Sequence, residues 1–179
     1  EQYKPANERE WIALHLSLVE RTLKSRSVQH LSKSQQSNRN RCLGILQRYK
    51  MAGNFPQNED YNYRTPIFID KHDNFCAVGF LIKETGNEPV ARMISATTNL
   101  AYVREMNYPE LDIWAKENGF TIDELAWIQP GYLPNTSCAP IASGVEGEVK
   151  ELYVDEATQQ MFVGGKFNFA DKTIIVNNI

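Results

Sequence analysis

The stretch SNRNRCLGILQRYKMAG, residues 37–53, decides the fold class of this chain. Its apolar residues recur at intervals of three and four, which places them on one face of a helix. They are Cys42, Leu43, Leu46 and Tyr49. Gly53 follows them, and glycine often stands just after a helix because it adopts the left-handed conformation without strain. The stretch therefore predicts a helix over residues 37–51 with one buried face.

Upstream of this helix, residues 7–24 predict another. Asn7 is a suitable N-cap, and Glu8 and Glu10 place negative charge near the positive end of the helix dipole. We expect an apolar stripe on this helix to face the core. The stripe consists of Trp11, Leu14, Leu18 and Val19. The polar residues 25–40 are expected to be exposed and partly loop.

Downstream, residues 54–66 contain two prolines with several Asn and Asp, and they predict a long loop. The apolar run 67–69 predicts a short strand, and residues 70–74 predict a turn. Helices are expected over 76–85, from Pro89, over 99–106 and over 109–119, because Pro89 and Pro109 suit a first helical turn. A last helix is expected after Thr121, whose spacing to Glu124 forms a capping box.

The composition changes beyond the proline-rich segment 133–143. Apolar residues around 149–154, 161–163 and 173–176 predict strands. So few strands do not form a stable unit alone, so we expect the native chain to continue past Ile179. The sequence therefore predicts a mainly α protein: a compact multi-helix domain with a short strand over 1–132, a linker over 133–143, and a small β segment over 144–179 that begins a repeat array.

Composition excludes several classes of protein. Hydrophobic residues make up 42% and charged residues 23%, the profile of a globular chain. Residues 1–50 hold ten Lys/Arg and four Asp/Glu, a net charge of +6, which leaves −9 for residues 51–179 in a total of −3. The basic residues are not interleaved with aromatics, so nucleic acid is not expected as a partner. No apolar run approaches the ~18 residues of a transmembrane helix.

Several short motifs stand out between about residues 41 and 132: Gly53-Asn-Phe-Pro56, Arg64-Thr-Pro66, Phe68-Ile-Asp70, Cys76-Ala-Val-Gly79, Tyr102-Val-Arg104, Trp114 and Ile128-Gln-Pro-Gly-Tyr132. Through these motifs the stretch resembles an uncharacterised domain of secreted bacterial proteins. The resemblance implies no particular activity.

The β segment resembles one repeat of a β-propeller-like array. The matching residues are Val145, Gly147, Val149, Phe162-Val-Gly-Gly165 and Phe167. Proteins built this way resemble others that end in a sorting domain for export to the cell surface. The chain also opens at Glu1 without an initiator Met, as expected for a mature exported protein. We therefore expect the protein to be secreted or held at the outer cell surface.

The three cysteines show no C-x-x-C spacing, so a zinc site is not expected. Cys76, at the start of a predicted helix, is a weak candidate nucleophile, because a helix N-terminus lowers a thiol pKa. Such a nucleophile needs a histidine within reach, and none follows His72. The preferred interpretation is a disulfide between Cys76 and Cys138, with Cys42 as a buried thiol.

Five polar residues within the matched motifs are candidates for binding. They are Arg64, Asp70, Tyr102, Arg104 and Gln129. Arg64 and Arg104 can each bind a carboxylate or phosphate through two hydrogen bonds. Alternatively, they can form ion pairs with Asp70 and Glu105 that hold a loop.

Other side chains could form a metal site, a glycan-binding site or a glycosidase carboxylate pair, but their patterns favour a structural role. Asp70, Asp73 and Asn74 fit turn chemistry better than a calcium loop. Four glutamates could supply the carboxylate pair of a glycosidase, and each is also an ordinary exposed helical residue. They are Glu84, Glu88, Glu105 and Glu110. The tryptophans are expected to anchor the core rather than bind sugar: Trp11, Trp114 and Trp127.

Without a complete catalytic set, the expected function is that of a non-catalytic N-terminal module of an exported cell-surface protein. Its role would be to bind an extracellular or envelope protein or glycan, or to cap the repeat array. The alternative is a cell-envelope hydrolase that uses Cys76 or a carboxylate pair. An anion-binding role for the basic N-terminal helices ranks third. No cofactor and no metal are expected.

Overall fold

The computed structural model describes residues 5–135, 145–155, 160–170 and 174–175. The chain divides into a helical unit, Glu1–Asn135, and a β unit, Thr136–Ile179. The division falls within the segment 133–143 that the sequence predicts to be a linker. Among the described residues, no helix is long and apolar enough to cross a bilayer.

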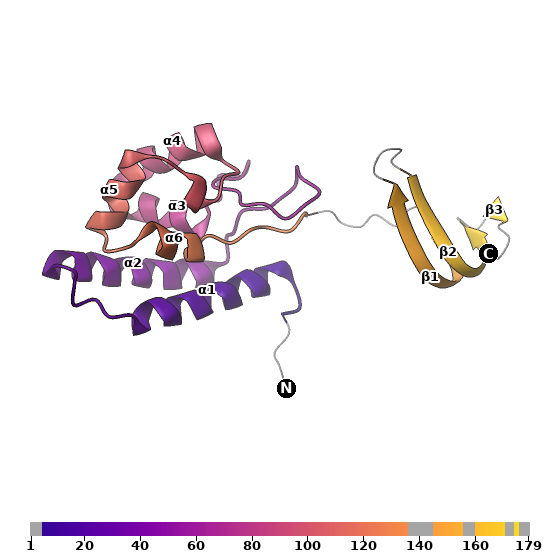
Figure 1. Ribbon diagram of the computed structural model, residues 1–179, viewed down its shortest axis with the longest axis horizontal. Coiled ribbons are helices and arrows are strands. Elements are labelled where there is room, and N and C mark those ends of the chain that lie inside the picture. Colours follow the sequence, from indigo (N-terminus) through magenta and orange to yellow (C-terminus); the bar gives the residue numbers. More distant parts are fainter. Residues whose placement is uncertain (1–4, 136–144, 156–159, 171–173, 176–179) are drawn as a thin grey trace. The chain divides into compact units, whose positions relative to one another are not determined.

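Two long helices lie side by side at one edge of the helical unit (Figure 1). The first, α1 (Glu8–Ser25), has Asn7 as its N-cap, as predicted, and the Asn7 side chain accepts a hydrogen bond from the Glu10 amide. The second, α2 (Lys33–Ala52), ends at Gly53 with φ +66°, also as predicted. It begins four residues before the predicted start, because Ser32 and Gln35 form a capping box in a polar stretch that carries no apolar period.

The predicted apolar stripe of α1 is wrong. The residues that α1 buries are Ile12, Leu16, Glu20 and Leu23. Trp11 is 39% exposed and Leu18 is 51% exposed. The helix carries two apolar rows, and only the row that meets α2 and the core is buried.

The remaining helices are short (Figure 1). Of these, α3 and α5 contact α2, α6 contacts α1, and α4 packs on α3. They are α3 (Ala77–Ile82), a π-type turn η1 (Lys83–Asn87), α4 (Glu88–Thr98), a 3-10 turn η2 (Val103–Glu105), α5 (Pro109–Glu117) and α6 (Ile122–Ile128). Pro109 starts α5, and the Thr121–Glu124 capping box starts α6, both as predicted. The predicted burial of Cys42, Leu43, Leu46 and Tyr49 is also found. The core of the helical unit further includes Phe68, Leu81, Ile94 and Leu125.

The short strand predicted at residues 67–69 is not formed. These residues are buried, but they make only an isolated bridge between Ile69 and Phe75. The Asn99 side chain takes the place of a partner strand: its Nδ2 donates to the Ile69 carbonyl (3.0 Å) and its Oδ1 accepts from the Ile69 amide (2.9 Å). Backbone hydrogen bonds complete the pairing of the segment: the Phe68 amide donates to the Asn99 carbonyl, and the Cys76 amide donates to the Phe68 carbonyl (both 2.8 Å).

The β unit is a three-stranded antiparallel sheet in the order β1-β2-β3. Strand β1 (Val145–Asp155) pairs with β2 (Gln160–Ala170), which pairs with β3 (Ile174–Ile175). The register shifts between Glu146 and Gly147 and again between Val149 and Glu151. The predicted mainly α class is thus confirmed, whereas the propeller-like repeats stay a prediction.

Candidate binding site

A hollow of about 410 Å³ opens where three segments of the helical unit meet. The segments are the first turns of α1, the loop 53–58 after α2, and residues 132–135 at the end of the unit. Its lining combines buried apolar side chains with exposed polar ones. The apolar ones include Ile12, Phe55, Pro56 and Tyr132. The exposed polar ones include Arg9, Gln57 and Asn135, and the half-buried Glu8 also lines the hollow.

One wall of the hollow depends on Gly53. The Arg9 guanidinium crosses over this residue, and its Nη2 donates to the Ala52 carbonyl (2.9 Å). A Cβ atom at Gly53 would stand 2.2 Å from Arg9 Nε. Glycine therefore serves twice here, by ending α2 in the left-handed conformation and by leaving room for Arg9.

Another part of the lining, residues 132–135, is tied to the loop 54–66. Tyr132 and Thr65 exchange two backbone hydrogen bonds (2.8 and 3.2 Å). Further along, the Asn135 amide donates to the Asn58 carbonyl (2.5 Å), and Asn58 Nδ2 donates to the Tyr132 carbonyl (3.2 Å). The last described residues of the helical unit are therefore fixed to its body.

Arg64 supports this wall rather than facing a ligand. Its Nη1 donates to the Gly131 carbonyl (2.6 Å) and forms an ion pair with Glu8 (3.3 Å). The guanidinium lies 4.5 Å from the centre of the Trp11 ring. Glu8 in turn accepts a hydrogen bond from the Leu133 amide (3.0 Å). Arg64 therefore holds a loop through an ion pair, which was the alternative to ligand binding. Its acidic partner is Glu8 and not the expected Asp70.

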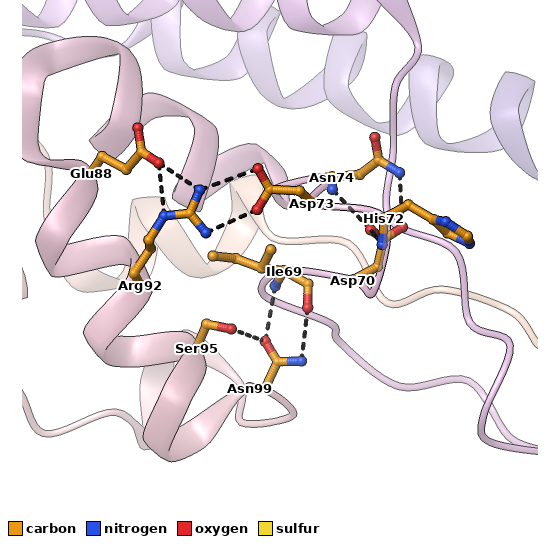
Figure 2. A network of polar contacts seen from close by, with 9 residues as sticks. All are labelled: Ile69, Asp70, His72, Asp73, Asn74, Glu88, Arg92, Ser95 and Asn99. Atoms are coloured by element: carbon orange, nitrogen blue, oxygen red, sulfur yellow. Dashed lines mark hydrogen bonds and ion pairs between the residues drawn. The ribbon is translucent and has the colours of Figure 1, made fainter.

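Asp70 organises the turn that follows residues 67–69 (Figure 2). Its Oδ1 accepts from the amides of His72 (2.9 Å) and Asn74 (2.8 Å). Its Oδ2 accepts from Asn74 Nδ2 (2.9 Å) and from the Gln57 amide (2.9 Å). Four amide donors thus occupy the carboxylate, as expected for a turn rather than a calcium loop. Through Gln57, Asp70 also holds the loop that lines the hollow.

The same turn is braced against α4 by charged side chains (Figure 2). Arg92 forms ion pairs with Asp73 (2.9 Å) and Glu88 (2.6 Å). Asp73 adopts φ +62°, a conformation that Asp tolerates better than most residues. The carboxylate of Glu88 is therefore part of a structural network.

The other three predicted binding residues lie around η2, and none of them lines the hollow. Gln129 is buried, and its Oε1 accepts from the Val103 amide (2.8 Å) while its Nε2 donates to the Ala101 carbonyl (3.2 Å). Tyr102 is exposed at the start of η2. Arg104 is exposed and pairs with Asp123 (3.0 Å), not with Glu105. The fold does not bring the five candidates into one site.

Cys76 has the properties of a structural thiol. It is completely buried, and its Sγ accepts a hydrogen bond from the Gly79 amide (3.3 Å) at the start of α3. Burial raises the pKa of Cys76 to about 12 and that of Cys42 to about 11. Both are free thiols. Cys138 lies outside the described residues, so the Cys76–Cys138 disulfide stays a prediction, and forming it would require access to the core.

None of the four glutamates proposed as a carboxylate pair lines the hollow. Glu88 is held by Arg92, and Glu105 accepts a hydrogen bond from the Tyr102 amide (3.1 Å). Glu84 and Glu110 are exposed, and neither lines the hollow described above.

The positive charge of the N-terminal helices is partly neutralised inside the fold. Lys24 and Lys50 both form ion pairs with Glu20 (2.6 and 2.8 Å). Burial opposes ionisation of Glu20, but the hydrogen bonds from these two lysines outweigh it and lower the Glu20 pKa. Arg39 is buried in a pair with Glu124. These contacts weaken the interpretation of the N-terminal helices as an anion-binding surface.

The sequence interpretation missed the hollow itself. Its lining comes from residues 8–12, 53–58 and 132–135, which are far apart in the chain. One feature of the sequence points to the hollow: two of the motifs that carry the resemblance, Gly53-Asn-Phe-Pro56 and Ile128-Gln-Pro-Gly-Tyr132, both border it. Of the tryptophans predicted as core anchors, Trp114 is buried, whereas Trp127 is only partly buried and Trp11 is exposed.

Comparisons of the chain with protein-family models, with curated proteins and with solved structures each give no match.

Proposed function

We propose that the chain is a non-catalytic N-terminal module of an exported cell-surface protein, and that its helical unit binds a partner through the hollow beside Tyr132. The observation that carries this proposal is the fixed segment 131–135. It walls the hollow and is also the part of the helical unit that leads toward the β segment. A partner in the hollow would therefore contact the residues that join the two units in sequence.

The chemistry of the hollow favours a short, uncharged peptide segment with an apolar side chain. Apolar side chains form its floor, and its volume lies within the ~300–1,000 Å³ of typical ligand sites. On the rim, Asn135 Nδ2 donates to Gln57 Oε1 (3.1 Å), which places amide groups where they can meet peptide groups. Of the two charged rim residues, Glu8 is paired with Arg64, and Arg9 donates to the Ala52 carbonyl. A peptide from an extracellular or envelope protein suits such a surface better than an ion.

A capping role for the helical unit is compatible with the same proposal. Terminal units of repeat arrays shield the first repeat from solvent, and the β unit is a single antiparallel sheet.

The alternative, a cell-envelope hydrolase, draws no support from these side chains. A nucleophilic thiol requires a lowered pKa and an accessible position, and Cys76 has a raised pKa and is buried. The nearest histidine in sequence, His72, is engaged with Glu59 (3.1 Å). We therefore retain the binding module as the proposed function.

The test is a binding measurement with the full chain. The probes are fluorescent tripeptides, blocked at both ends, with Leu, Ser or Lys at the centre, and soluble peptidoglycan fragments. We expect saturable binding of the Leu peptide alone. Leu133→Glu, on the rim, should abolish binding, whereas Ile113→Glu, at a similarly exposed apolar residue on α5, should leave it unchanged.

Three outcomes would contradict the proposal. Absence of binding by every probe would remove the hollow as a peptide site. Equal binding by wild type and Leu133→Glu would place the site elsewhere. Turnover of the peptidoglycan fragments, followed by mass spectrometry, would show that the module is catalytic.

A further inference from the structure

The helical unit contains a second cavity, with a volume of about 210 Å³. It is bounded by the connection between α1 and α2, the first half of α2, the end of α5 and the start of α6. Of the described residues that line it, none lines the hollow beside Tyr132. Its lining is rich in ionisable side chains, which are Arg26, His30, Arg39, Lys116 and Glu124.

The lining of this cavity carries an excess of positive charge. Arg26, Arg39 and Lys116 are positively charged and Glu124 is negatively charged, so the net charge is +2 with His30 neutral. The carboxylate of Glu124 is fully engaged, because its two oxygens accept hydrogen bonds from Arg39 (2.8 and 2.9 Å) and it also pairs with Arg26 (3.2 Å). One carboxylate thus serves two guanidinium groups, and the excess charge is left without a counter-ion from the lining.

Arg26 is held in place while part of its guanidinium stays available. Its Nε forms the ion pair with Glu124, and the guanidinium lies 5.2 Å from the centre of the Trp127 ring. Among the residues that the structure describes, none accepts a hydrogen bond from its Nη1 or Nη2, and the side chain is 51% exposed. An arginine fixed in this way can bind two oxygens of one anion.

Two further donors in the lining lack acceptors. Lys116 is exposed, and its ammonium group has no ion pair with a described residue, although its carbonyl accepts from Gln35 Nε2 (2.8 Å) and so fixes its backbone to α2. Arg39 Nε is buried and makes no hydrogen bond within the described part of the chain. A buried donor without a partner commonly marks the place of a water molecule or an ion.

The walls of the cavity are fixed by contacts within the protein. Gln36 Nε2 donates to the carbonyls of Val28 (3.1 Å) and Leu31 (2.8 Å), which holds the connection between α1 and α2. Gly119 adopts φ +69°, and a Cβ atom there would stand 2.9 Å from the Gln35 carbonyl oxygen. Glycine therefore lets the end of α5 approach α2 closely. Because the walls are already in place, a ligand would not have to order them.

We propose that this cavity binds the phosphate group of a small phosphate monoester. At pH 7 such a group carries about −1.5 to −2 charges, which matches the net charge of the lining, whereas a carboxylate would neutralise only half of it. Its oxygens suit the arginine fork of Arg26 and the point charge of Lys116.

The size of the cavity restricts the rest of the ligand. Its volume is below the ~300 Å³ of typical ligand sites, so it admits the phosphate group and a small organic part. Val28, Leu31 and Phe120 offer apolar contacts to that part. The site differs from the exposed basic surface of the N-terminal helices, because it includes Lys116 from α5. It is also independent of the peptide site proposed beside Tyr132.

The test is isothermal titration calorimetry of the full chain with phenyl phosphate, inorganic phosphate and benzoate at pH 7. We expect saturable binding of phenyl phosphate, competition by inorganic phosphate, and at least about tenfold weaker binding of benzoate. Arg26→Gln and Lys116→Gln should each weaken phenyl phosphate binding at least about tenfold, because each removes a charge-assisted contact. The matched control is Arg21→Gln, which removes an exposed charge of α1 outside the lining and should leave binding unchanged.

Circular dichroism checks that each variant is folded. If Arg26→Gln does not fold, Lys116→Gln still decides the question, since no described residue pairs with the Lys116 ammonium. Absence of binding, or binding that both cavity variants leave unchanged, would overturn the proposal. An equal loss in Arg21→Gln would show attraction to the overall charge instead of a site. Benzoate binding as tightly as phenyl phosphate would overturn the assignment to phosphate.

Discussion

Arg39 and Glu124, 85 residues apart in the chain, form a two-pronged ion pair in the interior of the helical unit. Arg39 Nη1 donates to Glu124 Oε2 (2.8 Å), and Nη2 donates to Oε1 (2.9 Å). Arg39 is 3% exposed and Glu124 is 5% exposed. The guanidinium also donates to the carbonyls of Gly119 and Leu23 and lies over the Phe120 ring. The pair joins α2 to the first turn of α6.

Removing the negative charge of this pair should destabilise the protein strongly. Glu124→Gln keeps the size of the side chain but leaves the buried Arg39 without its counter-ion, so we expect a loss of about 3 kcal/mol in the free energy of unfolding. Urea denaturation at pH 7 measures it. The matched control is Asp123→Asn, which breaks the exposed pair with Arg104 and should cost less than about 1 kcal/mol. Similar losses in the two variants would contradict the buried pairing.

The acidic partners of the buried ion pairs should make stability depend on pH. Burial opposes ionisation of Glu124, but the hydrogen bonds from Arg39 and from the Thr121 backbone, with the nearby charges of Arg39 and Arg26, lower its pKa below the ordinary 4.5. The unfolded chain therefore binds more protons as the pH falls below 4.5, and the stabilisation is lost as the pH passes through the folded pKa.

Urea denaturation between pH 7 and pH 3 checks this dependence. The free energy of unfolding of the wild type should be level above the ordinary pKa and should decline below it. The free energy of unfolding of Glu124→Gln should decline less steeply with falling pH. Part of the decline that remains is assigned to Glu20, whose pKa is also lowered. If the free energy of unfolding declined equally with pH in the wild type and in Glu124→Gln, Glu124 would not contribute to the pH dependence.

The two described thiols should be inert in the folded protein. Cys42 and Cys76 are buried, and burial raises the pKa of each, so native protein should resist iodoacetamide at both positions. In denaturant without reductant, both should become alkylated, as peptide mass mapping would report. A Cys76 that stays unmodified in denaturant until a reductant is added would instead support the predicted disulfide with Cys138.

Two buried tyrosines should respond oppositely to loss of their hydroxyl groups. Tyr49 donates to the Phe75 carbonyl (2.8 Å), whereas the Tyr132 hydroxyl makes no hydrogen bond of normal geometry to a described residue, although the Tyr49 hydroxyl is its polar neighbour. Tyr49→Phe should therefore cost about 1–3 kcal/mol, because the Phe75 carbonyl loses its donor. Tyr132→Phe should be neutral or stabilising, because a buried unsatisfied hydroxyl is removed. Thermal unfolding compares the two, and an equal loss in both would reveal a partner for Tyr132.

The local sequence determined most helix boundaries of this protein. Asn7, Gly53, Pro109 and the Thr121–Glu124 box each mark a helix end through contacts within a few residues, and the structure places them there. The buried face of α2 was predictable for the same reason, since its apolar residues follow a single period. The mainly α class follows from these short-range interactions alone.

The tertiary structure decided which of two apolar rows on α1 is buried and which ion pairs form. The spacing of apolar residues could not show whether the row of Ile12 and Leu16 or the row of Trp11 and Leu18 is buried, because both rows have the helical period. Only packing against α2 distinguishes them. Likewise, Arg64 pairs with Glu8, 56 residues away in the chain, rather than with the nearby Asp70, whose carboxylate is filled by amide donors of its own turn. The hollow beside Tyr132 exists only where three distant segments converge, so no local pattern encodes it.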